Sequence, residues 1–135
     1  MTKKVLVLSA SFRKHGNSDM LCDRFIQGAR EAGNEVEKIY VSDMRIGYCR
    51  GCGVCNRTHK CVQNDDMAAV LDKMVAADVI VMATPVYFYS MNGQLKTLID
   101  RTVPRYEEIR GKDFYYIVAA ADDNRDNMRR TIEGF

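Results

Sequence analysis

The sequence predicts an α/β protein in which a doubly wound parallel sheet lies between two layers of helices. Two short apolar runs, residues 5–8 and 79–83, are typical of strands that are buried on both faces of a parallel sheet. Segments with helical periodicity alternate with the predicted strands, as in sheets whose crossover connections are helices. Such sheets bind ligands outside the carboxyl ends of their strands, where the strand order reverses.

Length and composition place further limits on the protein. The chain has 135 residues, of which 47% are hydrophobic, so we expect one domain over residues 1–135, with an inserted cysteine loop at about residues 48–64. The net charge of +2 is too small to indicate nucleic acid. No apolar run approaches the ~20 residues that cross a bilayer, and the N-terminus lacks signal-peptide features, so we expect no membrane association and a cytoplasmic location.

The first half of the chain predicts two strands and one helix. The first strand is followed by a polar loop and then by a helix over residues 19–32. Asn17 or Ser18 can cap this helix, and Gly33 can end it. Residues 36–41 alternate weakly between apolar and polar, which indicates a second strand at the edge of the sheet.

The second half repeats the alternation. Asp65 or Asp66 is expected to cap a helix that extends to about residue 77, and Pro104 to stop a later one. The remaining expected elements, in chain order, are a strand over residues 79–83, a helix over 92–102, a strand over 114–121 and a short helix over 126–132.

Four of the five cysteines lie in the cysteine loop with the spacing Cys-x2-Cys-x2-Cys-x5-Cys. Thiolates are metal ligands and redox groups, and three interpretations fit this cluster. The opening is similar to that of ferredoxins and favours a [4Fe–4S] cluster, while structural zinc and metal-free thiols are the alternatives. The candidate ligands are Cys49, Cys52, Cys55 and Cys61, whereas Cys22 within the first helix is expected to be a core residue.

The polar loop over residues 9–18, which we call the hydroxyl loop, precedes the N-terminus of a helix. Its serine hydroxyls, the Asn17 amide and Arg13 can join the free N–H groups of that helix in binding a phosphate. The loop is neither a Walker A nor a Gly-x-Gly-x-x-Gly sequence, so a phosphomonoester such as that of FMN is favoured. The alternative is a polar turn that only caps the helix.

A second loop places three aromatic residues after a proline. Tyr87, Phe88 and Tyr89 cannot all enter one core, so at least one should face a flat ligand such as an isoalloxazine ring, or a subunit interface. No Ser-His-Asp arrangement is apparent. We therefore expect no catalytic side chains, with the chemistry supplied by a cofactor.

These motifs together resemble the iron–sulfur flavoprotein family, a group within the flavodoxin-like NAD(P)H-dependent FMN reductases. The resemblance rests on residues 9–18, on residues 49–61 followed by Asp65-Asp66-Met67, and on residues 84–93. It implies a flavodoxin-like sheet with the strand order 2-1-3-4. It also implies FMN at the switch point, a [4Fe–4S] cluster on the four loop cysteines, and NAD(P)H as an electron donor.

The resemblance further implies a homodimer or homotetramer and an electron-transfer partner such as ferredoxin. The FMN phosphate would lie on Ser9, Ser11, Arg13, Asn17 and Ser18. The isoalloxazine ring would lie along Pro85, Val86, Tyr87, Phe88 and Tyr89, beside Asn92 and Gly93.

Two departures from the family pattern are visible. Ser9 stands where many relatives have glycine, and the chain ends at Phe135 before a fifth strand and helix. The strand over residues 114–121 is then expected to be an exposed apolar edge, as in a truncated chain or one whose missing strand comes from a partner. Two other functions stay open: a flavin-only NAD(P)H-dependent FMN or quinone reductase with non-ligating cysteines, and a zinc-stabilised module without enzymatic activity.

Overall fold

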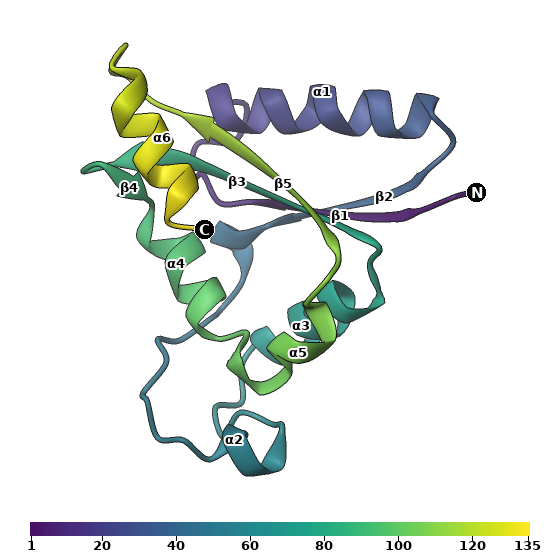
Figure 1. Cartoon of the computed structure of the whole chain (residues 1–135), viewed down its shortest axis with the longest axis vertical. Coiled ribbons are helices and arrows are strands. Elements are labelled where there is room, and N and C mark those ends of the chain that lie inside the picture. Colours follow the sequence, from purple (N-terminus) through teal and green to yellow (C-terminus); the bar gives the residue numbers. More distant parts are fainter.

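The computed structural model describes residues 1–135 and contains a sheet of four parallel strands (Figure 1). These strands are β1 (Lys4–Ser9), β2 (Glu35–Tyr40), β3 (Val79–Tyr87) and β5 (Asp113–Ala119). They lie in the order β2-β1-β3-β5, which confirms the predicted order 2-1-3-4. The chain runs from β1 to β2 on one side and then from β2 to β3 on the other side of β1, which places the switch point between β1 and β3.

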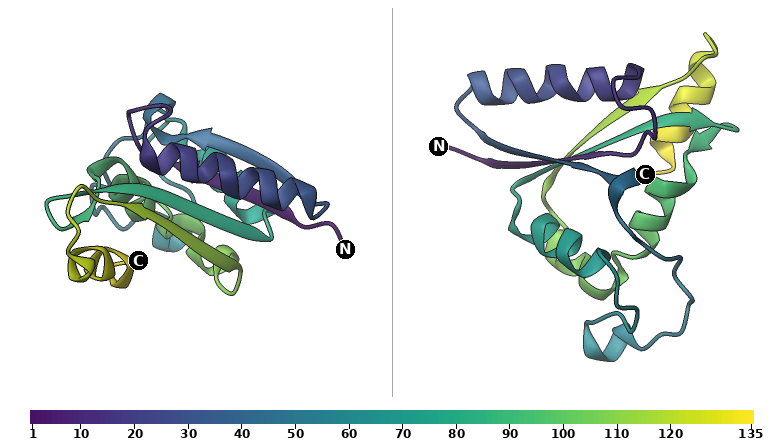
Figure 2. Two further views of the ribbon diagram at one scale, coloured as in Figure 1. Left: turned by 90° about the horizontal axis from the view of Figure 1, so that it is seen from above. Right: turned by 180° about the vertical axis from the view of Figure 1, so that it is seen from behind.

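Helices cover both faces of the sheet and form the predicted three layers (Figure 2). On one face lies α1 (Asn17–Glu31) alone. The other face carries α3 (Met67–Ala76), α4 (Gly93–Asp100), the short α5 (Tyr106–Ile109) and α6 (Arg125–Glu133). None of these helices combines the length and the apolar character that crossing a bilayer requires.

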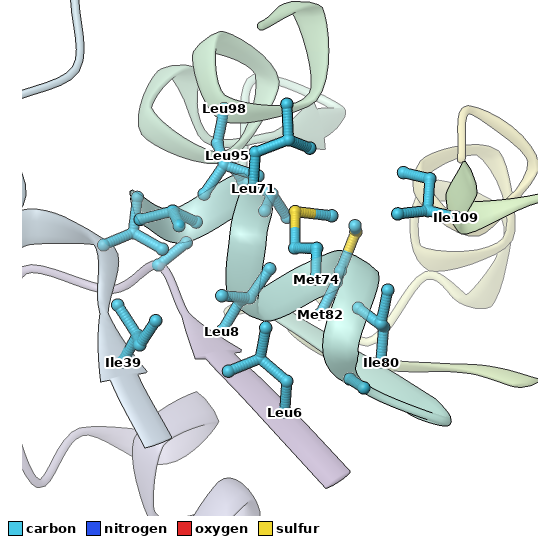
Figure 3. Packing of buried hydrophobic residues seen from close by; sticks show 14 of the residues in the cluster. Leu6, Leu8, Ile39, Leu71, Met74, Ile80, Met82, Leu95, Leu98 and Ile109 are labelled. Carbon is cyan, nitrogen blue, oxygen red and sulfur yellow. The ribbon is translucent and has the colours of Figure 1, made fainter. Parts of the chain in front are cut away.

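The apolar strands are buried on both faces, as their sequences predict. Leu6 and Leu8 of β1, with Ile80 of β3, join the larger core beneath α3 and α4 (Figure 3). Val5 and Val7 point to the opposite face and pack in a smaller core against α1. Adjacent residues thus enter different cores because side chains alternate along a strand.

The smaller core contains Cys22, which is fully buried and confirms its predicted role. Burial raises the pKa of this thiol to about 11. At the end of α1, Gly33 has a φ of +82° and donates to Arg30, while Asn34 donates to Ala29. This is a Schellman ending, so the prediction that Gly33 ends the helix is confirmed.

The strand predicted over residues 79–83 is longer than expected. It extends to Tyr87 as β3, and β4 (Ser90–Met91) pairs back with it in the antiparallel direction. The two residues between them, Phe88 and Tyr89, have φ angles of +49° and +68°. Two consecutive positive φ angles are typical of a type I′ turn, where Asn-Gly is preferred, so Phe-Tyr gave no hairpin signal.

The strand predicted over residues 114–121 is β5, and in this chain it pairs only with β3. Its other edge is open, as expected, and Tyr115 on it is half exposed. Aromatic contacts support the strand on both faces, from Phe25 of α1 to Tyr115 and from Phe135 to Tyr116. The edge therefore has side-chain support but no backbone partner.

Candidate functional site

The loops after β1 and β3 are joined at the carboxyl edge of the sheet by Asn92. Its Nδ2 donates to the carbonyl of Ala10 at 2.7 Å, and its backbone N–H donates to Oγ1 of Thr84 at 3.0 Å. Its Oδ1 also accepts from Leu95 at 3.1 Å and so caps α4. Asn92, predicted to lie beside a flavin ring, is fully buried, and its side chain bonds to the protein.

The hydroxyl loop is organised around a buried carboxylate that the sequence reasoning missed. Asp19 accepts hydrogen bonds from the Ser9 hydroxyl at 3.0 Å and the His15 backbone at 2.8 Å, and it pairs with Lys38 at 2.6 Å. Burial alone would raise the pKa of Asp19, but these hydrogen bonds outweigh it and lower the pKa. The one signal in the sequence is an aspartate in the first turn of a helix.

The N-terminus of α1 is free to receive a ligand. Neither Asn17 nor Ser18 caps it, so the predicted cap is wrong. The N-cap residue is Gly16, which has no side chain that could accept a hydrogen bond from the helix. The N–H groups of Asn17, Ser18 and Asp19 consequently have no acceptor within the chain. Three free N–H groups at the positive end of a helix dipole are suited to an anion.

The predicted phosphate residues surround this helix end in two groups. Ser9, Ser11 and Ser18 are buried, and the Ser9 hydroxyl is committed to Asp19. Arg13 and Asn17 are exposed. The residues are brought together, but the backbone of α1 and the exposed side chains are better placed for a ligand than the Ser9 hydroxyl.

The aromatic hairpin, residues 87–90, projects from the same edge. Tyr87, Phe88 and Tyr89 are 49%, 96% and 58% exposed, which confirms that the three do not enter a core together. Pro85 is buried, and Val86 is half-buried at the base of the hairpin. Non-glycine residues with positive φ cost about 1–3 kcal/mol each and cluster at ligand sites.

The cysteine loop extends away from the sheet at the far end of α4 (Figure 1). No residue from 48 to 66 is buried, and its one helical turn, α2 (Cys55–Thr58), was not predicted. Gly51 and Gly53 adopt positive φ angles of +64° and +71°, as a tight turn requires. All four cysteines line one cavity of about 210 Å³, namely Cys49, Cys52, Cys55 and Cys61.

An ion pair between the buried Arg101 and the partly buried Asp65 closes the neck of this loop, and no pattern in the sequence indicates it. Arg101 Nη1 and Nη2 donate to the two Asp65 oxygens at 2.8 and 3.0 Å, and Nη1 donates to the Gly47 carbonyl at 2.7 Å. The Arg101 guanidinium lowers the pKa of Asp65 to about 2. Asp65, predicted as a helix cap, also accepts from the Met67 backbone at 3.1 Å.

The two candidate regions approach each other beside α4. Tyr48, which precedes Cys49, lines a cavity of about 190 Å³ together with Gly93 and Gln94 at the start of that helix. Gly93 is one of the residues predicted to lie beside a flavin ring. The beginning of the cysteine loop thus lies beside the start of α4, the helix that follows the aromatic hairpin.

A parallel sheet with an anion-ready helix end and an aromatic hairpin at its switch point defines a flavodoxin-like protein. The profile of NADPH-dependent FMN reductase matches residues 3–129, and the chain belongs to that family. Among the solved structures, an NAD(P)H:quinone oxidoreductase from Methanothermobacter marburgensis superposes with a TM-score of 0.76 at 17% identity, over 99% of this chain and 72% of that one.

Two curated relatives are named iron-sulfur flavoproteins. The protein from Archaeoglobus fulgidus is 38% identical over 75% of this chain and 46% of its own length. The protein from Methanocaldococcus jannaschii is 39% identical over 75% of this chain and 52% of its own length. This chain spans about half the length of these relatives.

Proposed function

We propose that the protein is an FMN-dependent redox protein that passes electrons between FMN and an iron–sulfur centre held by the cysteine loop. The observation that carries this proposal is the single cavity lined by all four loop cysteines, in a chain whose fold has a separate site at the switch point. Bound FMN takes up a hydride and releases electrons, and an iron–sulfur cluster carries one electron at a time. The names of the similar proteins support the same pairing of cofactors.

The switch-point edge fits FMN through its donor groups. The free N–H groups at the start of α1 would hold the phosphate, with Arg13 adding a positive charge. The hairpin residues Tyr87, Phe88 and Tyr89 would provide aromatic walls for the ring. Asp19 would act indirectly, because its hydrogen bonds fix the loop that bends around the phosphate.

The geometry of the cysteine loop favours a cluster over one zinc ion. Zinc–sulfur bonds of about 2.3 Å would place the thiolates about 3.8 Å apart in a tetrahedral site. Only one set of three potential ligand atoms lies within 4.8 Å of one another, and it consists of His15, Asp19 and Asp23 rather than cysteines. Lys38 already pairs with both carboxylates of that set at 2.6 Å. No three of the cysteine sulfurs lie within 4.8 Å of one another.

We further propose that the protein works as a homodimer or homotetramer, with NAD(P)H or a ferredoxin-like protein as electron donor. The exposed cysteines Cys49 and Cys52 support exchange with a partner at the outer side of the loop. The boundary between Tyr48 and Gly93 supports exchange with the flavin on its inner side.

The test is the visible spectrum of protein purified without oxygen, with FMN, iron and acid-labile sulfide measured in the same sample. We expect flavin bands with a broad iron–sulfur shoulder and about four irons per chain. Serine substitution of Cys49, Cys52, Cys55 or Cys61 should lower the iron content and leave FMN bound. A Cys22→Ser variant, whose sulfur lies in the core, should keep its iron. Unchanged iron in all four loop variants would sink the proposal.

A second candidate is a flavin-only NAD(P)H-dependent reductase. A Bacillus subtilis relative named as a putative NAD(P)H-dependent FMN-containing oxidoreductase is 27% identical over 90% of this chain and 68% of its own length. This function predicts flavin bands without iron, together with rapid bleaching of the flavin by NADH or NADPH.

A further inference from the structure

Arg101 is the largest fully buried side chain of the protein, with an exposed fraction of 2%. It follows the last turn of α4 as the C-cap residue, at the end of the helix nearest the cysteine loop. Burial of a guanidinium carries a desolvation cost of several kcal/mol unless the group is fully paired. The contacts of the Arg101 guanidinium must therefore compensate for this desolvation cost.

The side-chain hydrogen bonds of Arg101 close the neck of the cysteine loop. Arg101 joins Asp65, just after Cys61, to Gly47, just before Cys49. The backbone N–H of Gly47 also donates to Asp65 at 2.9 Å, so the three residues form one closed network. Both ends of the cysteine loop are thus fastened to a single guanidinium.

One nitrogen of this guanidinium, Nε, has no hydrogen-bond partner. The Nε of Arg101 is the single buried side-chain nitrogen or oxygen of the chain without a hydrogen-bond partner. Arg101 and Cys61 line the same cavity of about 450 Å³. Asp65 raises the pKa of Arg101 most, and burial opposes this. Arg101 and Cys61 therefore border the same space at the neck of the cysteine loop.

We propose that Arg101 is a positioning residue of the iron–sulfur centre, which orients the Cys61 thiolate and places a buried positive charge against it. This inference rests on the proposed function. A positive charge and an N–H donor at a ligand sulfur stabilise the more negative, reduced state of a cluster. Arg101 should therefore raise the reduction potential of the cluster as well as hold the loop.

The test compares Arg101→Gln and Arg101→Lys with the control Lys60→Gln in the FMN-loaded protein, purified without oxygen. Lys60 is exposed, neighbours Cys61 in the sequence and carries the same charge. The reduction potentials of cluster and flavin are measured in one titration, by electron paramagnetic resonance and visible absorbance. Iron and sulfide are assayed on the same samples.

We expect Arg101→Gln to lower the cluster potential by at least 59 mV, a tenfold change in a one-electron equilibrium constant. The flavin potential should stay constant, and Lys60→Gln should shift the cluster by much less. Arg101→Lys keeps the charge, so it should retain iron and show a smaller negative shift, which tests the proposal even if Arg101→Gln loses its iron.

Two results would overturn the inference alone: wild-type potentials in Arg101 variants that hold full iron, or equal shifts in Lys60→Gln. An iron-free wild-type protein would instead overturn the proposed function, and this inference with it.

Discussion

Two loops of this chain carry candidate ligands, and they are held in different ways. The hydroxyl loop is anchored at both ends, because Ser9 and Ser11 at its start and Ser18 and Asp19 at its end are buried. The cysteine loop has no buried residue between positions 48 and 66. It is fastened at its neck, by the Asp65–Arg101 pair and by hydrogen bonds between Asp66 and Arg45. The first site is formed by the same core that folds the domain, whereas the second depends on polar contacts at its neck and on whatever its cysteines bind.

Charged side chains organise the two sites in different ways. Asp19 receives hydrogen bonds from a loop that already packs on the core, so it adjusts the shape of that loop. Asp65 and Arg101 replace a core that the cysteine loop lacks. Metal binding to such a loop is expected to contribute folding free energy locally, because its ligands have little other structure to hold them.

The largest expected effect is the loss of structure in the cysteine loop when iron is removed. In iron-free protein the amides of residues 48–64 should exchange hydrogen at rates near those of an unfolded peptide, while amides of β1 and β3 stay protected. Hydrogen exchange followed by mass spectrometry measures both regions in one sample. Equal protection of the loop with and without iron would show that the neck alone holds it.

The next largest effect should be the loss of stability caused by Asp65→Asn. Removing the carboxylate leaves the Arg101 charge buried and unpaired, which should lower the free energy of unfolding by about 3–5 kcal/mol. Asp72→Asn is the matched control, because Asp72 pairs with Arg105 at an exposed position, and its loss should cost less than about 1 kcal/mol. Urea unfolding followed by circular dichroism gives both values.

The Asp65–Arg101 pair should also make the free energy of unfolding depend on pH, an effect smaller than that of the substitution. The pKa of Asp65 is lowered from 3.8 to about 2 in the folded protein, so its contribution is complete above the unfolded pKa and is lost as the pH falls from about 4 to 2. The loss should approach about 2 kcal/mol in iron-free protein. Urea unfolding between pH 5 and 2 should show that the free energy of unfolding depends less on pH in Asp65→Asn than in the wild type.

The smallest expected effect on stability concerns the aromatic hairpin at the switch point. Replacing Phe88-Tyr89 by Asn-Gly should relieve the two positive φ angles and stabilise the fold by about 1 kcal/mol or more. FMN affinity, measured by fluorescence quenching, should fall because the aromatic walls are lost. Phe12→Asn removes an exposed aromatic residue without a positive φ, so it should give no gain in stability.

The parallel sheet could be predicted because its signals are local. The apolar runs of β1 and β3 and the cysteine spacing are each visible within a dozen residues. Asp19–Lys38 and Asp65–Arg101 join residues 19 and 36 positions apart, and no local pattern carries such pairs. The aromatic hairpin was missed for another reason: Phe-Tyr is an unfavourable sequence for its turn, and tertiary context overrides local preference there.

The burial of Cys22 also gives the protein a built-in reporter. A thiol in the core with a raised pKa reacts slowly with alkylating reagents, whereas the loop thiols are exposed or half-buried. Mass spectrometry after a short alkylation pulse can therefore distinguish three states of one molecule by added mass. A filled metal centre shields the loop thiols, an open loop labels four sulfurs, and global unfolding labels the fifth.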